Sequence, residues 1–563
     1  MTTYAYEAGR RARQAVPRAC AWLENVRPAA LLAPAIVIQW LAVAALALTV
    51  RHNGWLYYQG GDQLWYYTSG WLLRHGILAY PLVGPLWPAL LAPLSLLGGP
   101  TFVSALPAIV LLNVVVLLPI ALLCVFGIAQ RIGGRIFAYW ATLLWIATPY
   151  IGIKFTDAGY HQRYTELTLP GSFGLTALAD FPSMVAVLVA VYLALRTLDQ
   201  PERVSSIACG LAAGTAFAIK PSNSIFLTGL VLAFAYRRRF TQAAYVVAGL
   251  TPALLLLVLW KYRGLGYLPL FHAEGAAKLA LPAHQQLVAI ANPLTKYVHL
   301  DWHQLQANLD QIKEHFWSRR VVEWLVIAGL IGLARRSFTA LLLVGGWFVA
   351  FVLVKGTFVY ASVNDASVFR IMMPSFPAFV LMLASLVFLF PGRHRATVVP
   401  PPGAWGGNRR RLAVLAAAGA VFALFPLVLV AAASPLHGPR PRAYEAVGLL
   451  RAVDPSLRPS VTVAGQRVHL SWRPSQPAAA RVFYRIWRSG APTGGATCTP
   501  IPHGVDDCEL AMDDLGAPAS ASFTDAPGPG RWTYRLVLAA NWLDSALYGD
   551  VVAVGPPVTV LVG

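Results

Sequence analysis

The stretch AALLAPAIVIQWLAVAALALTV, residues Ala29–Val50, contains no charged side chain. A run of about 20 apolar residues is long enough to cross the hydrocarbon core of a bilayer as an α-helix. A secretory signal peptide would have a shorter apolar core and a small-residue cleavage site. We therefore expect a retained signal-anchor, with residues 1–28 as a cytoplasmic N-terminal segment. The arginines that precede the stretch fit this orientation: Arg10, Arg11, Arg13, Arg18 and Arg27.

The composition places the chain among polytopic membrane proteins. Its 563 residues are 57% hydrophobic and 12% charged, with a mean hydropathy of +0.57, whereas soluble domains are about a quarter charged. The net charge of +20 would suit nucleic acid, but most arginines stand between apolar segments, as the positive-inside rule describes. We therefore expect the membrane as a partner and no nucleic acid. The excess of Arg over Lys and the abundant Ala are typical of a GC-rich bacterial genome.

The apolar segments predict a polytopic α-helical membrane protein of about 11 spans. An odd count places the C-terminus on the side opposite the N-terminus, so the chain would sit in the cytoplasmic (inner) membrane with an extracytoplasmic C-terminus. The expected spans are Ala29–Val50, Thr101–Ile128, Ile136–Ile153, Phe181–Leu195, Ser205–Ile219, Ser224–Tyr236, Ala243–Trp260, Val321–Leu333, Phe338–Val354, Ile371–Phe390 and Leu412–Ala433.

The connections support this orientation. Every predicted cytoplasmic connection carries arginines, for example Arg237–Arg239 and Arg335–Arg336. The segment Pro81–Leu97 is apolar but contains four prolines. We expect it to be re-entrant or to lie on the surface, because counting it as a span would reverse every later connection. Lys154, Lys261 and Lys355 are interpreted as ordinary interfacial lysines whose charges reach water.

One acidic residue, Asp62, stands alone between Glu24 and Asp157. It follows the first apolar segment, within the aromatic sequence Tyr57–Tyr67. A charge kept at the mouth of a membrane protein is a functional-site hypothesis by default. The alternative is a solvated loop aspartate that forms a turn with Gly60 and Gly61.

The C-terminal part changes in composition. Residues 434–459 are rich in Pro and Arg and predict a linker, and residues 460–563 alternate in hydrophobicity with Gly and Pro turns. This pattern predicts an extracytoplasmic all-β sandwich, and Trp472 and Tyr534 give it a resemblance to a fibronectin type III module. Cys498 and Cys508 would form a disulfide in an oxidising compartment. The expected strands lie at 461–463, 467–472, 481–488, 531–538 and 551–554.

Residues 29–433 resemble the GT-C class of glycosyltransferases, in the branch of protein O-mannosyltransferases and aminoarabinose transferases. Five signals in order carry the resemblance: Asp62, then Gly76–Pro81, then Leu178–Pro182 with its Asp180, then the G-x-x-x-G-x-x-x-x-x-K-P pattern of Gly210, Gly214, Lys220 and Pro221, and finally Arg370–Pro377. Two features depart from the pattern of that branch: Gln63 follows Asp62 where a second acidic residue is usual, and the loop 154–179 is longer.

The resemblance implies a transfer of sugar from a polyprenyl-phosphate donor to an acceptor at the outer face, with inversion. Asp62 would be the base and Asp180 would assist it or orient the acceptor, although an Asp two residues before Pro182 also fits a helix N-cap. Arg370 and Lys220 would bind the donor phosphate. The alternatives are an interfacial anchor for Arg370 and a snorkelling helix end for Lys220. The acceptor would be a lipid, a glycan or a protein.

Aromatic residues near Asp62 can bind sugar or form a headgroup belt; the substrate-binding candidates are Trp65, Tyr66, Tyr67 and Tyr80. No cofactor is expected. Asp157, His161 and Glu166 are weak candidates for a divalent metal site, although the segment reads as a polar loop. The alternative functions are a non-catalytic lipid-linked saccharide flippase or transporter, a polysaccharide ligase or polymerase, and an assembly protein that works through its β domain.

Overall fold

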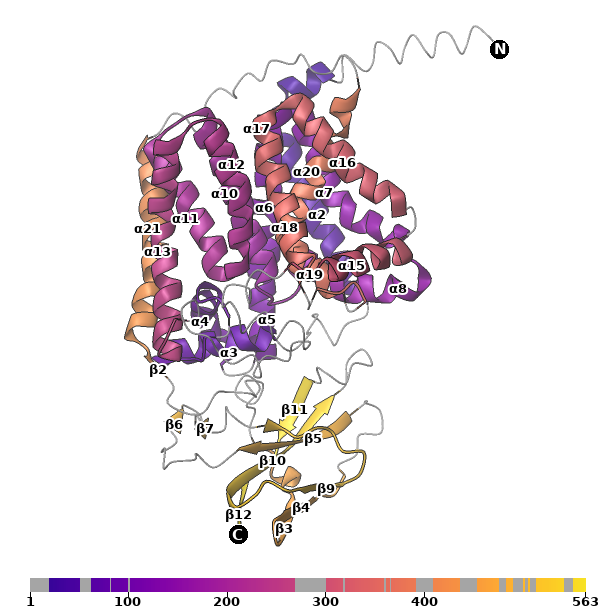
Figure 1. Ribbon diagram of the computed structural model, residues 1–563, viewed down its shortest axis with the longest axis vertical. Helices are drawn as coiled ribbons and strands as arrows, with labels where there is room; N and C mark the ends of the chain where they lie inside the picture. Colours follow the sequence, from indigo (N-terminus) through magenta and orange to yellow (C-terminus); the bar gives the residue numbers. More distant parts are fainter. Residues whose placement is uncertain are drawn as a thin grey trace, which may run out of the picture.

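The computed structural model describes residues 20–50, 62–81, 83–99, 102–268, 300–316, 319–358, 361–364, 366–390, 409–435, 453–474, 482–489, 500–501, 505–506, 513–540 and 550–563. A helical part and a smaller β part follow each other along the chain (Figure 1). Cys498 and Cys508, the predicted disulfide, lie outside the described residues.

The helical part contains every segment predicted to span the membrane, each of them as helix within the described ranges. Among the described residues, seven stretches are long and apolar enough to cross a bilayer, and the chain is a polytopic helical membrane protein by that criterion. The predicted number of about 11 spans is not confirmed by it. These seven are Pro28–Thr49 (α2), Ser104–Gly133 (within α5, η1 and α6), Arg135–Phe155 (α7), Asp180–Asp199 (α10), Phe240–Leu265 (α13), Phe338–Lys355 (α17, η6 and α18) and Ser367–Leu389 (α19, η7, α20 and η8).

The other helices of the described residues are too short, or have too short an apolar stretch, to meet this criterion. The bounds of the segments not yet given in full are α3 Asp62–Arg74, α4 Leu86–Gly98, α5 Phe102–Leu111, η1 Leu112–Leu117, α6 Leu118–Gly133, α8 Ala158–Arg163, η2 Tyr164–Thr168, α9 Leu169–Ser172, α11 Arg203–Ile219, η3 Pro221–Phe226, α12 Leu227–Tyr236, α15 Trp302–His315, α16 Arg319–Arg336, α17 Phe338–Ala340, η6 Leu341–Gly345, α18 Gly346–Lys355, α19 Ser367–Met372, η7 Met373–Ser375, α20 Phe376–Ala384, η8 Ser385–Leu389 and α21 Arg409–Ala432.

Helix α10 lies at the centre of the helical part. Its apolar window is 83% buried, more than that of any other candidate span. It packs against α6 on one side and α11 on the other, and α11 packs in turn against α13. A Cβ on Gly210 of α11 would lie 2.0 Å from Val246 O of α13. Small residues that allow such close approach are typical of membrane helix interfaces, so part of the glycine pattern read as a family signal has a packing role.

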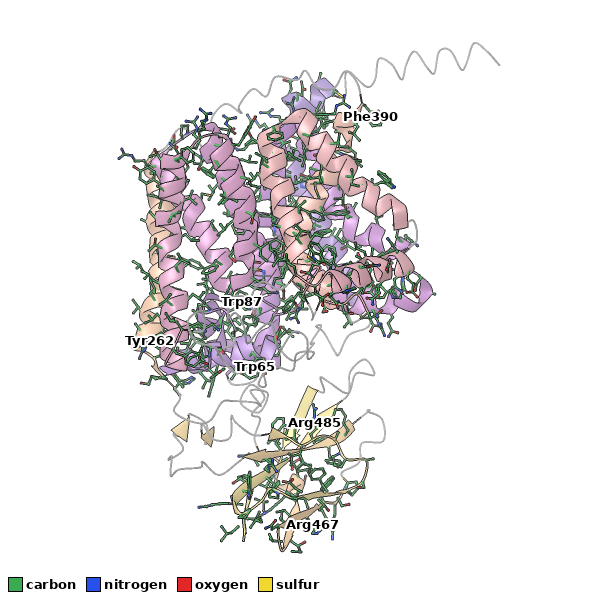
Figure 2. All side chains as sticks on the ribbon, in the orientation of Figure 1. Trp65, Trp87, Tyr262, Phe390, Arg467 and Arg485 are labelled. Carbon is green, nitrogen blue, oxygen red and sulfur yellow. The ribbon has the colours of Figure 1, made fainter. Side chains whose placement is uncertain are left out.

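Arginines gather at one end of the helical part, here called the arginine end. Arg131 pairs with Asp199 at 2.7 Å, joining the last turns of α6 and α10. Arg336 Nε donates to Ile132 O at 2.9 Å, and Arg335 Nη1 donates to Leu389 O at 2.9 Å. Through these contacts, connections that were predicted to be cytoplasmic lie together at one end of the helical part. Figure 2 shows Phe390 at this end and Trp65, Trp87 and Tyr262 at the opposite end, nearer the strands.

The segment Pro81–Leu97 contains a helix, α4, which packs against α3 and α5. Lys261 donates to Pro81 O and Trp260 Nε1 donates to Val83 O at 3.1 Å, so the end of α13 holds the turn before α4. A parallel pairing of β1 (Ile77–Leu78) with β2 (Ser434–Pro435) also ties the end of α3 to the residues after α21. Lys261, which was predicted to be an ordinary interfacial lysine, thus donates a hydrogen bond to a backbone carbonyl.

The described residues of the β part form two larger antiparallel sheets and a separate antiparallel pair, β6-β7. One has the order β11-β10-β5-β8 with β12 also paired to β10, and the other has the order β3-β4-β9. Side chains from both sheets, among them Leu470, Ile486 and Leu536, contribute to one hydrophobic cluster. The five predicted strands are present. The bounds are η9 Pro455–Leu457, β3 Ser460–Ala464, β4 Arg467–Ser471, β5 Val482–Ser489, β6 Pro500–Ile501, β7 Val505–Asp506, β8 Asp513–Asp514, β9 Ser522–Asp525, β10 Gly530–Ala540, β11 Asp550–Val554 and β12 Val558–Val562.

Candidate active site

Asp62 and Arg370 form an ion pair at the end of the helical part opposite the arginine end. Asp62 is the first residue of α3, and Arg370 lies in α19; Arg370 Nη2 donates to Asp62 Oδ2. The Asp62 side chain is 46% exposed, so the carboxylate is paired and still accessible. The end of the helical part that carries this pair is here called the site end.

Asp180 joins the same cluster from α10. Its carboxylate binds Lys220, the residue that follows the last turn of α11, and Oδ2 lies 3.6 Å from Arg370 Nε. The side chain is only 3% exposed. The N-cap residue of α10 is Ala179 and Asp180 is the first residue of the helix, so the N-cap alternative is wrong. A buried carboxylate requires partners of opposite charge, and two cations supply them here.

A third cation, Lys355, belongs to this cluster. Lys355 is the last residue of α18, and its charge interacts with those of Lys220 and Asp180. Its Nζ lies 4.7 Å from the centroid of the Phe358 ring. The interpretation as an ordinary interfacial lysine did not include this position near the site. The described residues of the cluster then bring three cations to two carboxylates, which leaves an excess of positive charge suited to an anion.

Tyr66 lies one helical turn after Asp62 on the same face of α3. It is buried, and burial together with the negative charges of Asp62 and Asp180 holds the pKa of its hydroxyl well above the usual value. The hydroxyl therefore stays protonated and can donate a hydrogen bond. Of the other aromatic candidates, Trp65 and Tyr80 are half-buried at this end.

Tyr67 has a different environment. It is fully buried, its hydroxyl donates to Gly99 O at 2.7 Å, and its ring meets Phe102 edge-on. Burial raises the pKa of this hydroxyl as well. With both its ring and its hydroxyl engaged in the protein, Tyr67 packs the interior rather than facing a substrate, which corrects the prediction for this residue.

Three buried side chains hold the segment that leads into Asp180. Gln63 Oε1 accepts from Ala177 N at 3.0 Å, and Trp87 Nε1 donates to Ala177 O at 2.9 Å. Asn113 Nδ2 donates to Gly174 O at 3.1 Å and to Thr176 O at 3.0 Å. Because these side chains come from α3, α4 and η1, the backbone before Asp180 is fixed from three directions. Sequence reasoning missed all three roles; only the position of Gln63 beside Asp62 gave any signal.

The weak metal candidates do not meet. Asp157 caps α8 through Tyr160 N at 2.8 Å and contacts His315, while His161 contacts Thr156 and Glu166 accepts from Gln162 at 3.2 Å. Each of the three thus has a different local partner. Among the residues that the structure describes, no group of three or more His, Cys, Asp or Glu side chains is placed to hold a metal ion.

Comparison with known proteins gives a limited result. No protein-family model matches the chain, and no curated protein matches it. Among solved structures, the oligosaccharyltransferase AglB of Archaeoglobus fulgidus in complex with an inhibitory peptide and a dolichol-phosphate matches with a TM-score of 0.35 and 15% identity over 72% of this chain and 56% of that one. The apo form of the Archaeoglobus fulgidus enzyme gives a TM-score of 0.36 and 16% identity over the same shares.

A third structure of the Archaeoglobus fulgidus enzyme, in complex with Zn and sulfate, gives a TM-score of 0.34 and 15% identity over 71% of this chain and 53% of that one. This chain thus spans about half the length of the proteins it matches. At these identities and TM-scores the similarity establishes no shared activity, and the chemistry below rests on the side chains of the site.

Proposed function

We propose that this chain is a membrane glycosyltransferase of the GT-C type, which moves a sugar from a polyprenyl-phosphate donor to an acceptor hydroxyl of a lipid, a glycan or a protein. The observation that supports the proposal is the convergence of Asp62, Asp180, Lys220 and Arg370 from four separate helices at one end of the helical part. These are the residues that carry the family resemblance in the sequence.

The cations of the site bind the donor phosphate. Lys220 and Arg370 contact Asp180, and the charge of Lys355 interacts with it. Cations fixed in advance stabilise the charge that develops on a leaving phosphate. The guanidinium can bind two phosphate oxygens at once, whereas each lysine offers a compact charge. Asp180 positions Lys220 and Arg370 and keeps these cations from repelling one another.

Asp62 is the base. In the described structure its Oδ2 accepts from Arg370, so this oxygen is occupied. A donor phosphate that binds the guanidinium releases the carboxylate for the acceptor hydroxyl. A neutral hydroxyl is a poor nucleophile without such a base. The site thus becomes competent when the donor arrives.

The reaction is a single displacement at the anomeric carbon. Asp62 takes the proton of the acceptor hydroxyl while the acceptor oxygen forms a bond to the anomeric carbon. The bond between that carbon and the phosphate oxygen breaks, its electron pair leaves with polyprenyl phosphate, and the configuration inverts. Tyr66, whose hydroxyl stays protonated, is placed to donate to a sugar or phosphate oxygen.

The orientation in the membrane follows from the two ends. The arginine end would face the cytoplasm by the positive-inside rule, which puts the site end, and the β part that Figure 1 shows beyond it, on the outer side of the cytoplasmic membrane. The β part would then be an extracytoplasmic fibronectin type III-like domain that handles the acceptor.

The test is turnover of a synthetic donor by the full-length protein in lipid vesicles. Release of mannose or glucose from the corresponding undecaprenyl-phosphate sugar, with water as acceptor, needs no knowledge of the natural acceptor. Asp62→Asn should lower this rate at least about 100-fold, the usual contribution of general base catalysis. Asp199→Asn is the matched control, because Asp199 is also 46% exposed and paired with an arginine.

Full turnover in Asp62→Asn would overturn the proposed base. Movement of the intact lipid-linked sugar across the vesicle membrane, unaffected by Asp62→Asn, would instead support the flippase alternative.

A further inference from the structure

The segment that joins Lys355 to Arg370 is held by α15. Gln304 Nε2 and Asn308 Nδ2 both donate to Ala361 O at 2.7 Å, and Asn308 also donates to Gly356 O at 3.0 Å. Asn308 is buried. Lys355 and Arg370 therefore lie at the two ends of a connection, and α15, a helix outside the site, donates hydrogen bonds to backbone carbonyls of that connection.

Helix α8 holds the same segment from another side. Tyr160 Oη donates to Val363 O at 2.5 Å, and Arg163 donates to Asn364 O. Val368 N donates to Ser362 O at 3.1 Å, so the held residues connect directly to the start of α19. Any shift of residues 361–364 would therefore move the helix that carries Arg370.

His315, the last residue of α15, links these elements. Its Nδ1 lies 3.0 Å from Asp157 Oδ2 and its Nε2 lies 3.3 Å from Asn364 Oδ1. Its ring stacks on that of Tyr160, with centroids 4.7 Å apart and planes inclined by 17°. The backbone joins the same elements, because Asp157 N donates to His315 O at 2.8 Å.

Both ring nitrogens of His315 face oxygen atoms that accept hydrogen bonds. A neutral imidazole carries one N–H, whereas an imidazolium carries two. Because the Asn364 amide can present either its oxygen or its NH2 group, both forms of the ring can bind Asp157 through Nδ1 and Asn364 through Nε2. Among the described residues, the neighbouring charged or titratable groups on these two helices include His161 and Arg163 on α8 and Lys313 and Glu314 on α15. Arg163 donates to Asn364 O, and Lys313 Nζ is 3.6 Å from Asp310 Oδ1.

We propose that His315 is a positioning residue for the site: its ring clamps residues 361–364 between α8 and α15 and thereby holds Arg370 against Asp62. Loss of the ring removes its contacts with Asp157 and Asn364 together, and the clamp weakens. The clamp itself is independent of the reaction, but its value for catalysis rests on the proposed function.

The pKa of the Asp157 carboxylate also reflects its contact with His315. The hydrogen bonds from His315 and from Tyr160 N hold the pKa of Asp157 below its usual value. Asp157 is therefore ionised near neutral pH and available as a hydrogen-bond acceptor for His315.

Amide hydrogen exchange of residues 361–364 and 366–368 in the full-length protein tests the clamp without any substrate. His315→Ala should speed exchange of this segment about tenfold, because the hydrogen bonds to Asp157 and Asn364 are lost. His303→Ala is the control, since His303 is an exposed histidine of the same helix.

Equal exchange in wild type and His315→Ala would overturn the proposal. If His315→Ala fails to fold, Asp157→Asn keeps a capping oxygen for Tyr160 N and removes the carboxylate oxygen that His315 contacts, and it should speed exchange of the same segment. Titration of wild type with undecaprenyl phosphate separates the two proposals: no binding together with faster exchange in His315→Ala would contradict the proposed function alone.

Discussion

Arg370 donates to Asp62 although 308 positions separate the two residues in the sequence. The same guanidinium lies 3.6 Å from Asp180 through its Nε, so one arginine is shared between an accessible carboxylate and a buried one. Any anion that enters the site competes with Asp62 for this cation more readily than with Asp180, because Asp62 is the more exposed partner. The predictions below follow from this arrangement.

Removal of the guanidinium should weaken phosphate binding. Arg370→Gln should lower the affinity for undecaprenyl phosphate at least about tenfold, and Arg370→Lys should recover only part of it, because lysine keeps the charge without the planar fork. Asp62→Asn should bind at least as tightly as wild type, since the competing carboxylate is neutralised. Quenching of tryptophan fluorescence on titration with undecaprenyl phosphate measures all three.

Arg74→Gln serves as the control for this prediction, because Arg74 is an arginine of α3 that donates to Ser95 O at 2.9 Å, away from the ion-paired cluster. Equal affinities of wild type and Arg370→Gln would contradict a phosphate-binding role for Arg370.

Loss of the buried carboxylate should destabilise the protein more than loss of the exposed one. Asp180 is only 3% exposed, and Asp180→Ala removes the carboxylate that pairs with Lys220 and Arg370. Breaking a buried pair in this way costs about 3–5 kcal/mol. Asp62→Ala should cost about 1 kcal/mol or less, as exposed pairs do. Thermal unfolding of the purified protein in detergent compares the two.

A double variant tests whether Asp180 acts through its cation. Asp180→Ala combined with Lys220→Met should be less destabilised than the sum of the single variants, because no buried ammonium is then left unpaired. Strict additivity of the two effects would indicate that the pair is not energetically coupled.

The segment before Asp180 should depend on Asn113. Asn113→Ala removes the donor to Gly174 O and Thr176 O, and an unsatisfied buried group costs about 1–3 kcal/mol. Both the unfolding temperature and the affinity for undecaprenyl phosphate should fall, since Asp180 loses its support. Asn25→Ala is the control, because Asn25 is exposed and makes only a local hydrogen bond to Ala21 O. A change in stability with unaltered affinity would limit Asn113 to a packing role.

The turn before α4 should tolerate no side chain at Gly84. A Cβ there would lie 2.2 Å from Ile219 O and 2.6 Å from Ala218 O, so Gly84→Ala must displace the backbone next to Lys220. Turnover of the synthetic donor should fall at least about tenfold with the protein still folded, because a small misplacement of a positioning group is costly. Gly171→Ala, whose nearest contact would be Met373 Cε at 3.4 Å, should leave turnover unchanged.

Much of the helical part could be predicted from the sequence. The eleven expected segments are helices in the described structure because a long apolar run can satisfy its backbone only as a helix, whatever surrounds it. The strands at 460–464 and 530–540 were predicted for a similar reason, since period-two alternation is a local property. Strands β9 and β12 were missed, because their alternation is short and their partners are distant.

The site residues likewise fall into those that could be predicted from the sequence and those that could not. Asp62, Asp180, Lys220 and Arg370 were named from the sequence, since a charge at the edge of an apolar segment is costly and therefore conspicuous. Lys355, Gln63 and Asn113 were not recognised, because a lysine at a helix end and an amide inside a helix look ordinary until their neighbours are known.

The sequence by itself determined which segments are apolar helices, which connections are basic and which charges are unusual, because these properties depend on residues close together in the chain. Only the tertiary structure decided that Arg370 pairs with Asp62, that Asp180 binds cations instead of capping α10, and that His315 joins two helices to the segment before Arg370. Each of these contacts unites residues from different elements, and their geometry follows from how the helices pack, which no local pattern encodes.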